Sequence, residues 1–141
     1  MGLCICSNGS HIELWGGYGM FFRIRERVAK AWDEELGEHY SKLSMAGIWS
    51  SQECKEFDAK THEIFSHERF KNEDADLAEF LFMSDCEGSI GYKTCGKIYN
   101  LIKDIKDDVV LRYAIDYDND WEDLKQLLKD CYSHRSKLRW S

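Results

Sequence analysis

The sequence contains no proline, and none of its apolar runs approaches the roughly 18 to 20 residues that a membrane-spanning helix needs. It is also short of positive charge, because 19 Lys and Arg residues stand against 26 Asp and Glu residues, a formal net charge of −7. This balance disfavours binding to nucleic acid or to an anionic membrane, since phosphate contacts depend on clustered Lys and Arg. The first residues lack the basic region of a signal peptide, so we expect a cytoplasmic protein.

Composition favours a folded chain with one core. Hydrophobic residues make up 43% of the sequence and aromatic residues 13%, which argues against disorder. A length of 141 residues fits a single domain, and no repeat, linker or low-complexity segment divides it, so we predict one domain over residues 1–141. The six cysteines form no Cys-x-x-Cys pair. In a reducing compartment we interpret them as buried thiols and not as disulfides or zinc ligands.

Hydrophobic periodicity predicts the elements of this domain. Alternation over 3–6 and 11–15 predicts a β-hairpin, and residues 137–140 predict a final strand. Apolar stripes with helical spacing predict helices over 20–36, 50–65, 72–81, 95–105 and 119–131. Residues 40–48 are interpreted as a connection, and residues 109–117 favour a strand through their β-branched and aromatic content. The pattern therefore predicts an α+β fold, mainly helical, with about five helices packed on a small antiparallel sheet formed by the N-terminal hairpin and the C-terminal strand.

Single residues within these helices carry further expectations. Ser50 and Glu53 have the spacing of a capping box, and so do Asn119 and Glu122. Gly37 fits the stop after the first helix, whose polar face includes Arg25. The histidines have no motif around them, so we expect them to face solvent and assign none a catalytic role.

A polar turn at 83–91 is the only cluster that invites chemistry. It contains Asp85, Cys86, Glu87 and Gly88, but an EF-hand loop from Asp85 would need glycine at Ile90, so calcium binding does not fit. Cys86 lies among carboxylates, which suppress its thiolate. We interpret the turn as structural, with Asp85 accepting backbone N–H groups and Gly88 supplying a positive φ. From these residues we therefore predict no catalytic residue, no metal ligand and no cofactor.

The order of elements and the motif Ser84-Asp85-Cys86-Glu87-Gly88, followed by Cys95, carry a resemblance. The chain resembles small bacterial proteins with a Ser-Asp-Cys-(Asp/Glu)-Gly turn, some of which are immunity proteins that accompany polymorphic or LXG-type toxins. It differs from them in Met83, where a histidine is expected, and in lacking a proline at the start of the following helix. The resemblance implies a protein that binds and neutralises a toxin, and it implies no catalytic residue.

We therefore predict a cytoplasmic immunity protein without enzymatic activity, whose partner is a toxin with a basic surface that the −7 charge would attract. Neither nucleic acid nor membrane is expected as a partner. The candidate partner-binding residues are Trp15, Tyr18, Trp49, Asp85 and Glu87, because Trp and Tyr are frequent interface anchors, although core burial is the more common fate of such aromatic residues. The alternative is a small metal- or ligand-binding protein, or a minor enzyme, centred on the Asp85-Cys86-Glu87-Gly88 turn.

Overall fold

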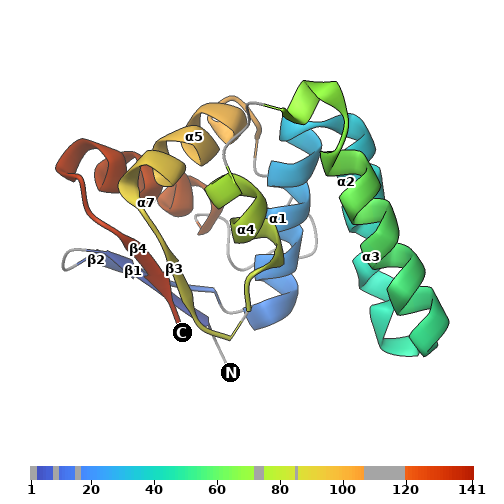
Figure 1. Cartoon of the computed structure of the whole chain (residues 1–141). Coiled ribbons are helices and arrows are strands. Elements are labelled where there is room, and N and C mark those ends of the chain that lie inside the picture. Colours follow the sequence, from blue (N-terminus) through green and yellow to red (C-terminus); the bar gives the residue numbers. More distant parts are fainter. Residues whose placement is uncertain (1–2, 8–9, 15–16, 72–74, 85, 107–119) are drawn as a thin grey trace.

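The structure is a computed structural model that describes residues 3–7, 10–14, 17–71, 75–84, 86–106 and 120–141. Over these residues the chain has an α+β fold in which helices pack against a small antiparallel sheet (Figure 1). The sheet has the order β2-β1-β4-β3, with β1 at Leu3–Ser7, β2 at Ser10–Leu14, β3 at Gly88–Ile90 and β4 at Leu138–Trp140. The predicted hairpin and final strand are confirmed, and β3 adds a strand where the sequence predicted only a turn.

One face of the sheet covers the core. Ile5 on β1 pairs with Trp140 on β4, Ile90 on β3 pairs with Leu138 on β4, and all four side chains are buried. Arg139 lies between two of them and is exposed. Side chains on a strand alternate between its faces, so the opposite face of β4 points away from the core.

Four helices pack on the buried face of the sheet (Figure 1). They are α1 (Gly17–Trp32), α4 (Ala75–Phe82), α5 (Tyr92–Ile102) and α7 (Asp120–His134). Their apolar stripes supply most of the core, including the fully or almost fully buried Val28, Leu81, Ile98 and Leu128. The helices predicted over 72–81, 95–105 and 119–131 are therefore confirmed within the described residues, although α5 begins earlier, at Tyr92, and ends at Ile102.

Lys125 joins α5 to α7. Although buried, its ammonium group donates to the carbonyl oxygens of Lys103 and Ile105, just beyond the last turn of α5. The fully buried Trp121 donates through Nε1 to the same Ile105 oxygen at 2.8 Å. Carbonyl groups at a helix C-terminus lack partners within the helix, and a cation there is favoured by the helix dipole. These bonds fix the end of α5 against α7.

Trp140 fixes the segment that precedes β3. Its indole Nε1 donates to the Ser84 carbonyl oxygen at 3.0 Å, and its ring lies over Gly88, where a Cβ atom would come within 2.4 Å of it. Glycine is therefore needed at position 88 to make space for the indole. The φ of Gly88 is not in the left-handed region, so the positive φ predicted for this residue is wrong.

Arg25 is buried, although the sequence placed it on the polar face of α1. Its guanidinium donates to the carbonyl oxygens of Met83 and Ser84 at 2.8 and 3.3 Å, and lies 4.4 Å from the ring centroid of Phe21. A guanidinium is weakly hydrated and packs well on aromatic faces, which explains why this arginine tolerates burial. The segment before β3 is thus fastened by both α1 and β4.

Residues 33–71 form a separate layer, which we call the arm, on the side of α1 that faces away from the sheet (Figure 1). The arm contains the helices α2 (Glu34–Ser41) and α3 (Ser51–Phe65) and the 3-10 helices η1 (Lys42–Ile48) and η2 (Glu68–Phe70). The predicted connection at 40–48 is therefore mostly helical. The Ser50–Glu53 capping box that begins α3 is confirmed in both of its hydrogen bonds.

Gly37 lies inside α2 and does not end the first helix, which corrects the prediction. Helix α1 ends at Trp32 because Asp33 adopts an extended backbone, with φ of −157°, and caps α2. Gly37 is buried against α1, and a Cβ atom there would lie 2.6 Å from Lys30 Cα. The glycine therefore permits close packing of two helices. Residues 109–117 and the Asn119 cap lie outside the described residues.

Candidate functional site

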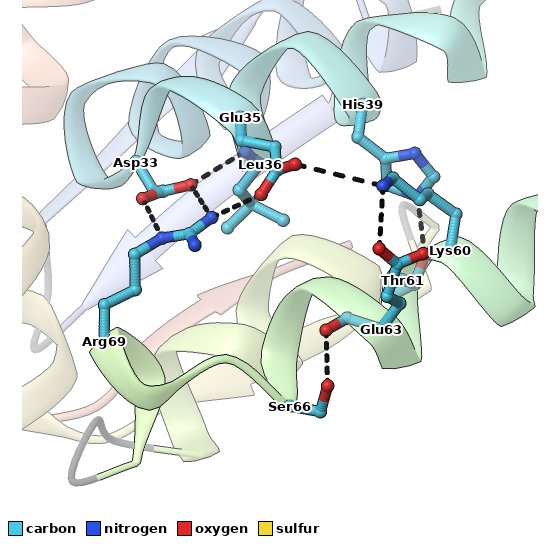
Figure 2. A network of polar contacts seen from close by, with 9 residues as sticks. All are labelled: Asp33, Glu35, Leu36, His39, Lys60, Thr61, Glu63, Ser66 and Arg69. Carbon is cyan, nitrogen blue, oxygen red and sulfur yellow. Dashed lines mark hydrogen bonds and ion pairs between the residues drawn. The ribbon is translucent and has the colours of Figure 1, made fainter.

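The arm is fastened at its base by Arg69. The Arg69 guanidinium forms a two-pronged ion pair with Asp33, at 2.8 and 3.0 Å, and reaches Glu35 at 2.6 Å (Figure 2). Asp33 also accepts the Leu36 backbone N–H at 2.9 Å, which makes it both helix cap and ion-pair partner. The hydrogen bonds from Arg69 hold the pKa values of the Asp33 and Glu35 carboxyls below their ordinary values. The start of α2 is therefore joined to the end of the arm.

An aromatic cluster lies beside this ion pair. Trp32 packs against Phe65 and Phe70 with ring centroids 5.9 and 5.4 Å apart, and Phe65 and Phe70 are 5.1 Å from one another. Leu36 and Ile64 are fully buried nearby in the same core. Such ring pairs contribute about 0.5–1.5 kcal/mol each beyond the burial of their area. The two ends of the arm are thus held by packing as well as by charge.

His39 is buried in the arm, which corrects the expectation that the histidines face solvent. Its ring stacks on Phe57, with centroids 4.0 Å apart and planes 13° apart, and its Nε2 lies 2.8 Å from Thr61 Oγ1 (Figure 2). The Thr61 hydroxyl donates to the Phe57 carbonyl oxygen at 3.0 Å. Because the hydroxyl proton of Thr61 is already donated to Phe57, Thr61 Oγ1 can only accept from His39. We therefore assign the ring proton to Nε2, which donates to Thr61 Oγ1.

This assignment leaves His39 Nδ1 as a buried acceptor without a hydrogen-bond partner among the described residues. Protonating it would place an unpaired N–H group in a desolvated position. Burial, followed by the positive charges of Lys42 and Lys60, lowers the pKa of His39. The imidazole is therefore neutral at pH 7, and it supports the packing of α2 on α3.

The outer end of the arm carries two exposed apolar side chains. Among the described residues the large exposed hydrophobic side chains include Met45, 54% exposed, and Ile48, 77% exposed. Residues three apart eclipse in a 3-10 helix, so both lie on one side of η1. Trp49 follows directly, half-buried, with its ring 5.1 Å from that of Phe57. We call Met45, Ile48 and Trp49 the η1 patch.

A hollow of about 220 Å³ adjoins the η1 patch. Its lining residues come from α2, α3 and the segment between them: His39, Lys42, Trp49, Glu53, Glu56, Phe57 and Lys60. Two glutamates and two lysines line the hollow, but the arm as a whole is acidic, since residues 33–71 contain nine Asp and Glu but five Lys and Arg. The arm therefore combines exposed apolar side chains with surplus negative charge, which is typical of a protein-binding surface.

The structure separates the residues predicted to bind a partner. Trp49 lies in the η1 patch. Trp15 and Asp85 lie outside the described residues, as does the Tyr18 side chain, although position 18 belongs to α1. Glu87 is exposed directly before β3, on the sheet side of the molecule and away from the arm (Figure 1). Met45 and Ile48 were not predicted as partner-binding residues, because the segment around them was interpreted as a connection.

The cysteines only partly match the prediction that they are buried. Cys95 and Cys131 are fully buried, whereas Cys54 and Cys86 are exposed. The hydrogen bond to Cys131, together with burial, raises the pKa of the Cys95 thiol, which therefore stays protonated. Cys54 is exposed because only Ile64 is buried among the residues of α3. Within the described part of the chain, no group of three or more His, Cys, Asp and Glu side chains could hold a metal ion.

Comparison of the chain with protein-family models, with curated proteins and with solved structures found no match. Across the described residues, every helix is too short or too polar to cross a membrane.

Proposed function

We propose that this chain is a binding protein that docks a basic protein partner onto the outer end of the arm. The exposure of Met45 and Ile48 on η1 is the observation that carries the proposal. Neither side chain contributes to the core, and η1 contains no buried residue. Apolar side chains exposed in this way gain favourable free energy when a partner removes them from water.

The net charge of the arm favours a basic partner. Glu53 and Glu56 line the adjoining hollow together with Lys42 and Lys60, so the excess of negative charge comes from the whole of residues 33–71, with nine Asp and Glu against five Lys and Arg. Complementary charge accelerates association and disfavours partners of the same sign. The half-buried Trp49, packed on Phe57, is suited to anchor the interface because its ring is already held in place.

We further propose that the partner is a toxin domain and that the chain acts in the cytoplasm as its immunity protein. This step rests on the resemblance of the Ser84–Gly88 motif, and the arm supports it by offering a binding surface that needs no catalytic group. A basic nuclease, or another enzyme with a cationic cleft, fits the acidic arm. The turn-centred alternative has less support, because Cys86 and Glu87 are exposed.

Co-expression with the product of the adjacent gene tests the proposal. We expect the chain to protect cells against that product and to bind it with micromolar or tighter affinity. Ile48→Asp should weaken binding at least about tenfold, the effect of losing about 1.4 kcal/mol at an interface anchor. Its melting temperature should be unchanged, because Ile48 is already exposed. Absence of binding, or full binding by a folded Ile48→Asp variant, would contradict the proposal.

A pair of charge variants tests the electrostatic part. Glu56→Lys with Asp58→Lys reverses two exposed charges on the arm, whereas Asp104→Lys with Asp123→Lys makes the same change in net charge on exposed residues elsewhere. We expect the arm variant to associate more slowly with the partner and the control to associate at almost the original rate. Equal slowing by both pairs would mean that net charge, and not the arm, attracts the partner.

A further inference from the structure

A second surface feature lies between α5 and α7, apart from the arm. It is an open groove of about 800 Å³, within the range of about 300–1,000 Å³ found for small-molecule sites. The lining residues are Tyr92, Lys93, Gly96, Lys97, Tyr99, Asn100, Lys129, Tyr132, Ser133 and Arg135. The bonds from Lys125 and Trp121 described above fix the two helices that form its walls, so the groove is built on a rigid base.

The groove is strongly basic, although the chain as a whole is acidic. Lys93, Lys97, Lys129 and Arg135 line it, and none of the described carboxylates does. The ion pairs seen within the described residues do not use Lys93, Lys129 or Arg135, and involve cations such as Arg69 and the lysines at 60, 71 and 125. Four cations around one groove, on a chain with a net charge of −7, concentrate positive potential in one place.

Arg135 provides independent support, because its backbone is in an unfavourable conformation. It has a φ of 52°, and among the described residues it is the only one other than glycine with a positive φ. It directly follows α7, the position after a helix end at which glycine is the usual residue. Residues held in such conformations are concentrated at functional sites. An arginine here places a guanidinium in the groove at a cost that glycine would avoid.

The aromatic side of the groove is also held in place. The Tyr132 ring lies against Gly96, where a Cβ atom would come within 2.5 Å of it, and its centroid is 6.4 Å from that of Tyr92. Tyr132 is nevertheless 55% exposed. Glycine at position 96 thus lets the ring lie directly against α5, while part of the side chain stays exposed.

We propose that this groove binds a nucleoside triphosphate, with the phosphates on Lys93, Lys129 and Arg135 and the base on Tyr132. Lysine and arginine form charge-assisted hydrogen bonds with phosphate oxygens, and a tyrosine face stacks on a planar base. A compact ligand fits better than a long nucleic acid, because a strand that left the groove would meet an acidic surface. The site does not depend on the arm, and neither proposal requires the other.

Calorimetric titration of the full chain with ATP, GTP and inorganic triphosphate tests the proposal, at about 0.1 M salt, where the screening length is about 10 Å. We expect a nucleotide to bind more tightly than triphosphate. Lys129→Gln and Arg135→Gln should each weaken nucleotide binding at least about tenfold, the equivalent of about 1.4 kcal/mol. Lys106→Gln, which removes an exposed lysine outside the groove, is the matched control and should bind normally.

Variants at Tyr132 distinguish the contribution of the base to binding from that of the phosphates. Tyr132→Ala should weaken ATP binding but not triphosphate binding, and Tyr132→Phe, which keeps the ring, should retain both. A thermal melt of each variant establishes that it is folded. Absence of binding by all three probes at millimolar concentration would overturn the proposal. So would equal affinity for ATP and triphosphate, or tighter binding of a 12-nucleotide single strand than of ATP.

Discussion

Replacing Gly37 by alanine tests how closely α2 packs on α1. The added Cβ atom would lie 2.6 Å from Lys30 Cα and 2.9 Å from Lys30 N, and these are backbone atoms that cannot rotate away. Ordinary contacts between carbon atoms are about 3.5–4.0 Å, so α2 must move by about 1 Å. The φ of Gly37 is not left-handed, so the expected cost comes from these contacts and not from backbone strain.

The expected loss in the free energy of unfolding is large for the addition of one methyl group. Overpacking a buried position costs about 1–3 kcal/mol, and the displaced helix also carries the buried Leu36 and Tyr40 away from their neighbours. Alanine regains about 1 kcal/mol through its better helix propensity. Because two further buried side chains are displaced, we place the cost at the upper end, about 3 kcal/mol. We therefore expect a net loss of about 2 kcal/mol and, for a chain of this size, a melting temperature lower by about 6 °C.

Gly47→Ala is the matched control, because a Cβ atom at position 47 would meet nothing within 4 Å. Thermal unfolding followed by circular dichroism measures both variants. The control should melt at the original temperature or slightly above it, since alanine restricts the unfolded chain more than glycine does. If Gly37→Ala melted as high as Gly47→Ala, the close contact between α1 and α2 would be refuted.

Three further predictions concern other parts of the molecule. Arg135→Gly should raise the melting temperature by about 3 °C, because relief of the left-handed backbone returns about 1 kcal/mol; a lower melting temperature would contradict the strain. Burial lowers the pKa of His39, so on acidification the unfolded chain takes up a proton at a higher pH than the folded chain does. The free energy of unfolding should therefore fall as the pH drops from 7.5 to 5, a range that spans the pKa of about 6.5 of an unfolded histidine. In His39→Phe, the free energy of unfolding should depend less on pH over this range. An unchanged dependence on pH would mean that other groups cause the effect. In the native protein, a disulfide-forming thiol reagent should label the exposed Cys54 and Cys86 but not the fully buried Cys95 and Cys131, and mass spectrometry measures the labelling. Labelling of the two buried cysteines before unfolding would show that the core between α5 and α7 opens.

Local signals in the sequence were sufficient to predict most of the helices. The Ser50–Glu53 capping box and the stripe from Trp121 to Cys131 depend on neighbours along the chain, and the structure confirms both. Strand β3 could not be predicted in this way. Its three residues carry no alternation of their own, and they become a strand only because β4, from the far end of the sequence, pairs with them.

The burial of polar residues could not be predicted from the sequence either. Arg25 and His39 occupy helix positions that look solvent-facing by periodicity. Yet Arg25 is covered by the rings of Phe80 and Trp140 from other elements, and His39 by that of Phe57. Lys93 and Lys97 likewise have the spacing of an ordinary solvated helix face. Only the packing of α5 on α7 brings them to one groove with Lys129. Sequence periodicity shows which side of a helix is apolar, but not what lies opposite its polar side.

The central place of β4 in the sheet has a consequence for the folding of the nascent chain. Because β4 lies between β1 and β3, Ile5 meets Trp140 only after about 135 residues have been synthesised between them. The hairpin leaves the ribosome early with one edge unpaired, and β3 has no strand to join until residues 138–140 emerge. Contacts so distant in sequence slow folding, since a large loop must close before they form. Until residues 138–140 emerge, the apolar faces of α4 and α5 therefore lack part of the core that they pack against, which favours association with other chains.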